Sequence, residues 1–282
     1  MVKKILYKLK RKLLLIQKHS KVLFSRTGLA KEYNFQKAKD YWHNVPQAQG
    51  ATPWNTKKLK NISDDDLIEQ FNKEQIKSRK KDERKLGFSL ALKSINELKD
   101  PLIIDYGSGI GFYGFEILDK FQSAKVTFID INKANLLIID RIAKIKGYSK
   151  RVKTIQVEDE RAEKLNLSEQ YDFIISMGVL HHTPHAKKIV SNLTLFLKKD
   201  GIFQVMLYNK HFKKRLSIYK GYKISNSEFG ELTDPEINNL KNPYSEDYDD
   251  KKTLRLFGDQ YRMISKDYPT TDYNTYQFLK TK

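Results

Sequence analysis

The apolar run Leu102–Asp105 ends in an acidic side chain, and a glycine-rich turn follows it. The next residues read Tyr-Gly-Ser-Gly-Ile-Gly, so Gly107, Gly109 and Gly111 occupy alternate positions. Glycines at a strand-to-helix turn accept positive φ angles and let a ligand approach the backbone, and the first N–H groups of the next helix can bind it. The spacing therefore predicts a ligand-binding turn at this point of the chain.

A second acidic side chain, Asp130, ends the next apolar run, 25 residues after Asp105. A carboxylate at such a strand end accepts hydrogen bonds from the two ribose hydroxyls of a nucleoside. The dinucleotide pattern GxGxxG is formally present from Gly109, but its first glycine comes too late after the strand, and Asp105 would repel a pyrophosphate. No Lys-Ser or Lys-Thr pair follows, as a P-loop requires. A nucleoside with a cationic amino acid end and no phosphate fits: S-adenosylmethionine.

Two adjacent histidines, His181 and His182, follow the apolar run Phe173–Met177. Open α/β sheets bind ligands at the carboxyl ends of their strands, so these rings are expected near the ligand. A histidine with a pKa of about 6.5 can take a proton near neutral pH. Either ring could instead hydrogen-bond a backbone carbonyl as part of the packing, and both interpretations stay open. We expect no metal site, because two histidines without a carboxylate partner fall short of the usual ligand number.

Short apolar runs alternate with amphipathic segments from residue 102 onward. This alternation predicts an α/β fold with a doubly wound, mostly parallel sheet. Two further strands are expected near the C-terminus as a hairpin, which makes seven in all. The predicted strands are Leu102–Asp105, Val126–Asp130, Val152–Val157, Phe173–Met177, Ile202–Leu207, Tyr261–Ser265 and Tyr273–Leu279, and the intervening helices are at 115–121, 132–146 and 185–197.

The N-terminal segment, residues 1–31, holds ten basic side chains and no acidic one, about half of the net charge of +19. Apolar residues at helical spacing predict an amphipathic helix at residues 2–26. Such a basic helix would lie on an anionic membrane surface, bind nucleic acid or pack on its own protein, and lysine-rich composition alone also accounts for the charge.

Two further parts complete the predicted organisation. Residues 32–98 are expected to form a helical cap, with Ser63 as the N-cap of a charged helix toward Lys85. A lid over an acceptor could be formed by Trp42, Trp54, Tyr41 and Tyr208, or these side chains could be ordinary packing of the N-terminal cap on the sheet. Residues 99–282 are expected to form the ligand-binding domain, with an acidic insertion at about 222–252.

Cysteine is absent from the sequence. This excludes disulfides, thiolate metal sites and a cysteine nucleophile, and it fits a reducing compartment. The longest apolar run near the N-terminus, Leu13 to Ile16, is far shorter than the roughly 20 residues of a membrane span. We therefore expect a cytoplasmic protein, in peripheral contact with membrane if the basic helix binds lipid.

From about Leu102 to Asn209 the chain resembles the class I S-adenosylmethionine-dependent methyltransferases. The resemblance rests on the glycine turn, on Asp130 and on the loop Gly-Val-Leu-His-His-Thr-Pro at residues 178–184. A helix, Asp200-Gly201 and the strand with Met206 follow at the family's spacing. The nearest groups are small-molecule and quinone or lipid methyltransferases. The resemblance implies a Rossmann-like seven-stranded methyltransferase sheet with an N-terminal helical cap.

The resemblance also implies a set of site residues. His181 and His182 are the candidate catalytic residues. The family usually holds the adenine amino group with the Asp of an Asp-Ala pair after the third strand, where this chain has Arg161-Ala162-Glu163. Arginine accepts no hydrogen bond, so adenine would be read by backbone groups near Ala162 or by Glu163. The implied cofactor-binding residues are Asp105, Gly107, Ser108, Gly109, Gly111, Asp130, Ile131, Ala162, Glu163 and Met177.

We therefore expect an S-adenosylmethionine-dependent methyltransferase, EC 2.1.1.-, that acts on a small-molecule or lipid-linked acceptor by in-line displacement. RNA methylation is the alternative that the net charge favours, although the acidic stretch 228–250 would repel phosphates and no RNA-binding module is visible. A catalytically silent binding or membrane-adaptor protein with the same fold is the third interpretation. The sequence leaves the acceptor, the methylated atom and the oligomeric state open.

Overall fold

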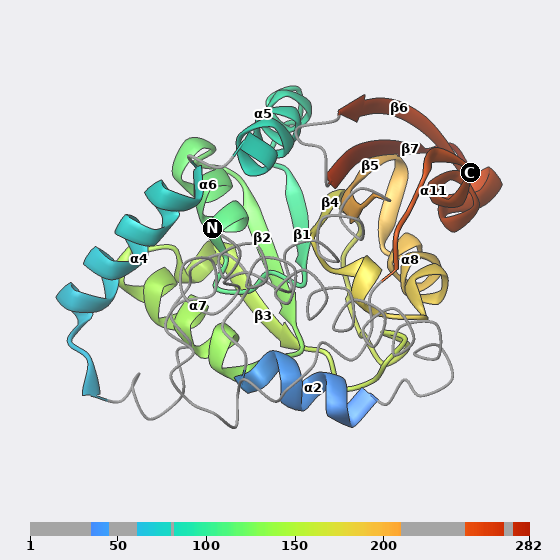
Figure 1. The fold of residues 1–282 in the computed structure, drawn as a ribbon. Helices are drawn as coiled ribbons and strands as arrows, with labels where there is room; N and C mark the ends of the chain where they lie inside the picture. The colour runs from blue at the N-terminus through green and yellow to red at the C-terminus, as the bar shows by residue number, and fades with distance from the viewer. Residues whose placement is uncertain (1–34, 45–60, 80–81, 210–245, 268–272) are drawn as a thin grey trace, which may run out of the picture.

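A mixed sheet of seven strands organises the molecule (Figure 1). The computed structural model describes residues 35–44, 61–79, 82–209, 246–267 and 273–282 of the 282-residue chain. The strand order is β3-β2-β1-β4-β5-β7-β6, in which β1 to β5 are parallel and β7 is antiparallel to both of its neighbours. The predicted fold class, including the terminal hairpin, is confirmed.

The elements have the following bounds. The strands are β1 (Leu102–Tyr106), β2 (Lys125–Asp130), β3 (Val152–Gln156), β4 (Tyr171–Met177), β5 (Leu197–Tyr208), β6 (Tyr261–Asp267) and β7 (Tyr273–Lys280). The helices are α2 (Phe35–Asn44), α4 (Asp64–Arg79), α5 (Asp82–Ile95), α6 (Phe112–Lys120), α7 (Lys133–Ile145), α8 (Ala186–Thr194) and α11 (Asp250–Phe257). Three short 3-10 turns in the described residues are η2 (Ser149–Arg151), η3 (Leu180–His182) and η4 (Gly258–Gln260). 

The three described turns connect α7 to β3, β4 to α8 and α11 to β6.

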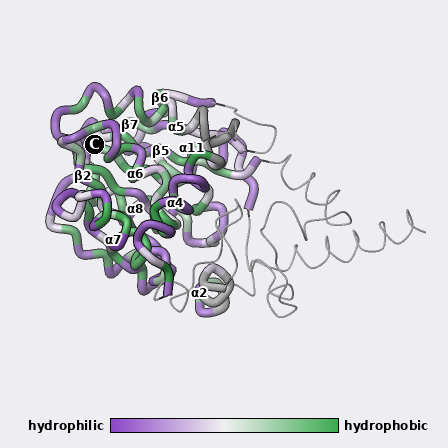
Figure 2. The backbone as a smooth tube through the Cα atoms, turned by 90° about the vertical axis from the view of Figure 1, so that its left-hand side faces the viewer, coloured by the Kyte–Doolittle hydropathy of each residue, from purple (hydrophilic) through white to green (hydrophobic). Residues whose placement is uncertain are grey.

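Apolar side chains pack on both faces of the sheet. Consecutive side chains of a strand point to opposite faces, so Ile103 joins the core beneath α4 to α7, whereas Ile104 joins the core beneath α8 and α11. Both side chains are fully buried. The sheet is therefore covered by helices on its two faces, as parallel strands that are apolar on both sides require. In Figure 2 the hydrophobic strands run between helices with hydrophilic segments.

Several predicted boundaries are corrected by the structure. The helix expected at 185–197 ends at Thr194, because β5 begins at Leu197, which pairs with Tyr171 of β4. The charged helix expected from Ser63 toward Lys85 ends at Arg79, and the next helix, α5, begins at Asp82. The cap itself is as predicted, since the N–H of Asp66 donates to the Ser63 hydroxyl at 3.1 Å.

Helix α2 lies across the end of the sheet at which β3 ends (Figure 1). Phe35, Ala38 and Trp42 fall at i, i+3 and i+7, on one face of the helix, and all three line the cavity described below. Figure 2 shows α2 outside the two layers of helices that enclose the sheet. The basic arm predicted at residues 1–31 and most of the acidic insertion at 222–252 lie outside the described residues, so both stay predictions.

Candidate active site

The glycine turn joins β1 to α6 and is packed tightly against its surroundings. The N–H groups of Gly107 and Ser108 donate to the carbonyl of Ile129 on the neighbouring strand, at 2.7 and 3.1 Å. Gly107, Gly109 and Gly111 have φ angles of +70°, +59° and +84°, which side chains with a Cβ rarely adopt. A Cβ on Gly107 would stand 2.3 Å from a methyl group of Val179. The turn thus needs glycine here for its backbone angle and for close approach.

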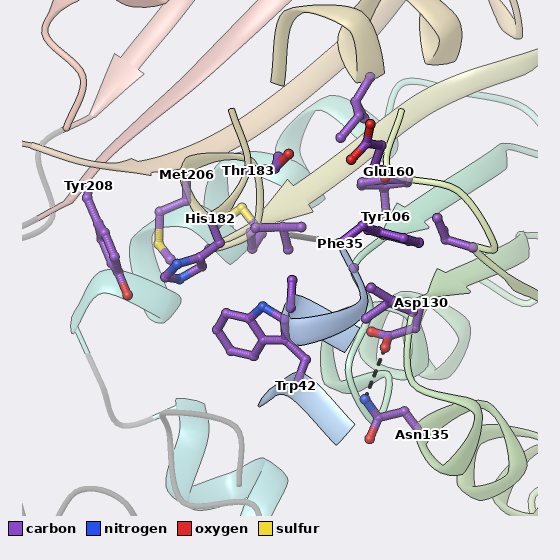
Figure 3. A pocket seen from close by; sticks show the side chains of 18 of the residues that line it. Phe35, Trp42, Tyr106, Asp130, Asn135, Glu160, His182, Thr183, Met206 and Tyr208 are labelled. Carbon is purple, nitrogen blue, oxygen red and sulfur yellow. Dashed lines mark hydrogen bonds between the residues drawn. The ribbon is translucent and has the colours of Figure 1, made fainter. Parts of the chain in front are cut away.

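Asp130 holds the turn to the end of β2. One of its carboxylate oxygens, Oδ2, accepts from the N–H of Gly109 at 2.8 Å. The other, Oδ1, accepts from the N–H of Asn132 at 2.7 Å and from the side-chain amide of Asn135 at 3.2 Å (Figure 3). Burial raises the pKa of Asp130 to about 6, against these hydrogen bonds, which lower it. A carboxylate has about four acceptor positions, so Oδ2 retains one for a ligand hydroxyl.

Asp105 lies on the other side of the turn and is 3% exposed. Its Oδ2 accepts from the N–H of Gly114 in the first turn of α6, at 3.3 Å. Burial, and to a smaller extent the nearby Asp130, raise the pKa of Asp105 to about 7. Asp105 thus fixes the start of α6, and it does not line the cavity.

A cavity of about 180 Å³ opens at the carboxyl ends of the strands, beneath α2. Figure 3 shows two chemically different ends. Asp130, Asn135 and Glu160 lie at the polar end, near Tyr106. The other end is made of rings and thioethers, contributed by Trp42, His182, Met206, Tyr208 and, from the C-terminal hairpin, Tyr273. Among the described residues that line the cavity there is no lysine or arginine.

The two histidines occupy different environments. The ring of His182 lines the cavity, with its centre 4.7 Å from that of Trp42 and 5.2 Å from that of Tyr208. His181 is fully buried behind this wall and stacks on Tyr208, with ring centres 3.5 Å apart. Burial holds the pKa of His181 well below its ordinary value, so this ring is neutral. Of the two, His182 is placed to meet a ligand, and His181 supports the ring of Tyr208.

The segment after β3 contributes a different pair of residues from those expected. Asp159 and Glu160 line the cavity, whereas Ala162 and Glu163 do not. The carboxylate of Asp159 accepts three backbone N–H groups, those of residues 161, 163 and 164, at 2.9–3.0 Å. These bonds lower the pKa of Asp159, although burial opposes them. Ala162 is buried with a φ angle of +57°, which turns the chain away from the cavity.

The structure thus brings some of the expected site residues together and leaves others outside. Lining the cavity are Gly107, Asp130, Ile131, Met177 and His182. Not among the lining residues are Asp105, Ser108, Gly109, Gly111, Ala162, Glu163 and His181. The cavity residues that the sequence analysis did not assign are Phe35, Ala38, Tyr106, Asn135, Val157, Asp159, Glu160, Gly178, Val179, Thr183, Ile189, Met206 and Tyr273. Asp159 and Glu160 could have been predicted from the sequence, because they are acidic residues close to the end of the predicted strand Val152–Val157.

Comparisons with known proteins match the central part of the chain. Residues 104–203 match the model of a methyltransferase domain. This segment is thus similar to the class I S-adenosylmethionine-dependent methyltransferases. The methyltransferase fold extends beyond the matched residues, since a methyltransferase structure from Clostridium acetobutylicum superposes with a TM-score of 0.53 at 13% identity, over 78% of this chain and all of the other.

Three curated relatives of this chain have different acceptors in their names. A ubiquinone biosynthesis O-methyltransferase of Histophilus somni is 31% identical over 119 residues, 42% of this chain and 49% of the relative. A malonyl-[acyl-carrier protein] O-methyltransferase of Ilyobacter polytropus is 26% identical over 118 residues, 41% and 43%. A ribosomal RNA small subunit methyltransferase G of Mycoplasma capricolum is 25% identical over 163 residues, 54% and 69%. The chain spans less than half the length of the first two.

Within the described residues, no group of three or more histidine and acidic side chains is arranged to hold a metal ion. None of the helices in the described part of the chain is long and apolar enough to cross a membrane.

The raised pKa of Asp105 predicts how the stability of the protein changes with pH. A carboxyl whose pKa rises from 3.8 to about 7 on folding contributes stability below pH 3.8 and loses that contribution as the pH rises through about 7. Asp105→Asn removes this titration and keeps an acceptor for Gly114. Relative to wild type, the variant should therefore gain on the order of a few kcal/mol in unfolding free energy between pH 5 and pH 8. Urea unfolding of both proteins at pH 5 and pH 8 measures the gain. If the unfolding free energies of variant and wild type differ by the same amount at both pH values, the prediction is contradicted.

Proposed function

We propose that the protein transfers the methyl group of S-adenosylmethionine to a small-molecule acceptor. The observation that carries the proposal is the carboxylate of Asp130, which faces a cavity beside the glycine turn, at the polar end of a site whose other end is lined with rings. The match of residues 104–203 to a methyltransferase domain and the position of the cavity at the carboxyl ends of the strands support it.

The residues of the polar end fit the cofactor. Asp130 has an acceptor position for a ribose hydroxyl, and Gly107 lines the same cavity with backbone that carries no side chain. Glu160 lines the cavity and offers carboxylate oxygens, so we infer that it takes the place of the family's Asp in accepting from the adenine amino group. When bound, S-adenosylmethionine supplies a methyl group on a cationic sulfur.

The ring-lined end is proposed to hold the acceptor. Trp42, Tyr208 and Met206 present apolar surface there, and the described lining has no cation to pair with a phosphate or a carboxylate. These features support an acceptor that enters the cavity with an uncharged, flat group. A lipid-linked acceptor agrees with this chemistry, because its long chain would leave the cavity while the head group reacts.

The protein's part in the reaction is alignment and proton transfer. Methyl transfer to a nucleophile needs the two reacting atoms in line, at about 3–3.5 Å. Trp42 and Tyr208 would orient the acceptor, and α2 would exclude water from above. His182 would take the proton of a hydroxyl acceptor as the methyl group arrives, which general bases accelerate by about 10²–10⁴-fold.

The role of His182 gives a direct prediction. His182→Ala should slow methyl transfer by about 100-fold or more, the contribution of a general base, while S-adenosylhomocysteine affinity stays close to that of wild type. His185→Gln is the control, because His185 lies on the same loop and does not line the cavity. Glutamine keeps a hydrogen-bond donor for Glu160, the partner of His185 at 3.5 Å. An equal loss of affinity and rate, together with a lower melting temperature, would instead assign His182 a structural role.

Calorimetry with S-adenosylmethionine and S-adenosylhomocysteine tests the first step of the proposal. Micromolar or tighter binding is expected, and absence of binding would overturn it. Incubation with methyl-labelled S-adenosylmethionine and a panel of phenols, amines and their isoprenoid-linked forms then tests the acceptor. Binding without transfer to any of them would favour the catalytically silent alternative.

RNA methylation is the second candidate, which the net charge of +19 favours. The lining of the described cavity argues against it, because phosphate contacts need lysine or arginine. Retention on immobilised RNA that falls steeply with salt, together with label incorporated into RNA, would establish this alternative.

A further inference from the structure

Asn132 connects three parts of the site. It lies between β2 and α7 and is 7% exposed. Its backbone N–H donates to Oδ1 of Asp130 at 2.7 Å. Its side-chain oxygen accepts from the N–H of Ala134 at 2.8 Å, and its side-chain nitrogen donates to the carbonyl of Trp42 at 3.1 Å, 90 residues earlier in the chain.

Both side-chain bonds of Asn132 satisfy helix ends. The first N–H groups and the last four carbonyls of a helix lack partners within it. Ala134 is in the first turn of α7, and Trp42 is in the last turn of α2. An asparagine amide carries both an acceptor and a donor, so one side chain caps the beginning of α7 and the end of α2. Aspartate and serine also cap a helix start, but neither reproduces the second bond.

The end of α2 carries a ring that closes the cavity. The ring centre of Trp42 is 4.7 Å from that of His182, at the ring-lined end (Figure 3). α2 lies outside the two helical layers (Figure 2), so its position depends on contacts such as the one with Asn132. Asn132 thus links the carboxylate at the polar end of the cavity to the cover of the other end.

We propose that Asn132 is a positioning residue, a latch that holds α2 and Trp42 over the acceptor end when a ribose occupies Asp130. The proposal rests on the proposed function. Ribose hydroxyls on Asp130 fix its carboxylate, and the carboxylate fixes the backbone of Asn132. The amide then stays aligned with the carbonyl of Trp42, so the cover closes over a site that already holds the methyl donor and excludes water from it.

The fluorescence of Trp42 reports the latch without knowledge of the acceptor. The sequence has two tryptophans, Trp42 and Trp54, so Trp54→Phe leaves Trp42 as the reporter. The probe is S-adenosylhomocysteine at saturation, and quenching by acrylamide measures how exposed Trp42 is. In this parent, the probe should lower the open fraction of α2 by about fivefold, the factor that one net hydrogen bond provides.

Two matched substitutions in the parent test which side chain acts. In Asn132→Ser, the serine still caps α7, but its side chain is too short to reach the carbonyl of Trp42. Quenching of Trp42 should therefore be the same with and without the probe. Asn192→Ser makes the same amide-to-hydroxyl change in α8, where it removes a side-chain donor to the carbonyl of Arg161 and no bond to α2. This control should keep the protection of Trp42 at saturating probe.

The outcomes separate the latch from the proposed function. A parent that fails to bind S-adenosylhomocysteine overturns the proposed function. If the parent binds S-adenosylhomocysteine but the quenching of Trp42 does not change, the latch alone is overturned. The latch is also overturned if the probe protects Trp42 in the Asn132→Ser variant as much as in the parent. If Asn132→Ser does not fold, hydrogen exchange of the unaltered chain replaces the quenching experiment. With the probe bound, the backbone amides of α2 should exchange about fivefold more slowly. An unchanged exchange rate overturns the latch.

Discussion

Gly107→Ala is expected to abolish measurable cofactor binding and to lower stability by about 2–4 kcal/mol, the sum of overpacking and a left-handed backbone angle. The added Cβ would stand 2.3 and 2.7 Å from the two methyl groups of Val179. Val179 is β-branched, so its side chain cannot turn away freely. The turn must therefore shift away from Val179, and a displacement of about 1 Å is enough to cost 10²-fold in a positioned site. Calorimetry and urea unfolding measure the two effects.

Two variants separate collision from backbone strain. Gly147 has a φ angle of +73°, close to that of Gly107, but a Cβ there would meet nothing within 4 Å. Gly147→Ala should therefore cost only the strain, about 1–2 kcal/mol, and leave cofactor affinity unchanged. Adding Val179→Ala to Gly107→Ala removes the colliding methyl groups and should restore part of the affinity, measured against Val179→Ala alone. Failure of this rescue would contradict the collision as the cause.

Asp130→Ala is expected to weaken S-adenosylhomocysteine binding by more than about 100-fold, because a charged hydrogen bond to a ribose hydroxyl contributes about 1.5–3 kcal/mol and two hydroxyls are available. The sequence alone predicts that the fold stays intact. The structure shows that the loss also leaves three donors without their acceptor, from Gly109, Asn132 and Asn135. Burial of the charged carboxylate opposes folding, so part of this cost is offset. Calorimetry and thermal unfolding should be measured together.

Asp140→Ala is the control for Asp130→Ala. Asp140 belongs to α7, its carboxylate accepts from the hydroxyl of Thr154, and it does not line the cavity. The control should bind S-adenosylhomocysteine as wild type does. Asp130→Asn keeps an acceptor oxygen and should lose less affinity than the alanine variant. An Asp130→Ala protein that binds as well as wild type would exclude the ribose contact.

The sheet was predictable from the sequence because its strands are apolar and evenly spaced. Runs such as Val126–Asp130 are buried on both faces, so they stand out against the charged helices between them. The start of β5 was missed, since it contains Lys198, Lys199 and Asp200, which are exposed and polar. Pairing with β4 sets that boundary, and pairing between distant residues is not visible in a local pattern.

The site was predictable only in part. Asp130 is the last residue of β2, and Gly107 directly follows β1. Both were predictable because open α/β sheets bind ligands at the carboxyl ends of their strands. His181 stacks on Tyr208 and His182 lines the cavity because of the way η3 turns at this point. Two adjacent histidines in a sequence do not indicate which of the two rings faces the cavity. The contribution of α2 was equally hidden, because the contact between Trp42 and Asn132 joins residues 90 positions apart.

A structure of the protein with S-adenosylhomocysteine tests the central claim most directly. The account predicts that ribose hydroxyl oxygens lie at hydrogen-bond distance from the carboxylate of Asp130, about 2.5–3.0 Å, and that the sulfur faces the end lined by Trp42, His182 and Tyr208. A ligand bound elsewhere, or a ribose turned away from Asp130, would contradict it.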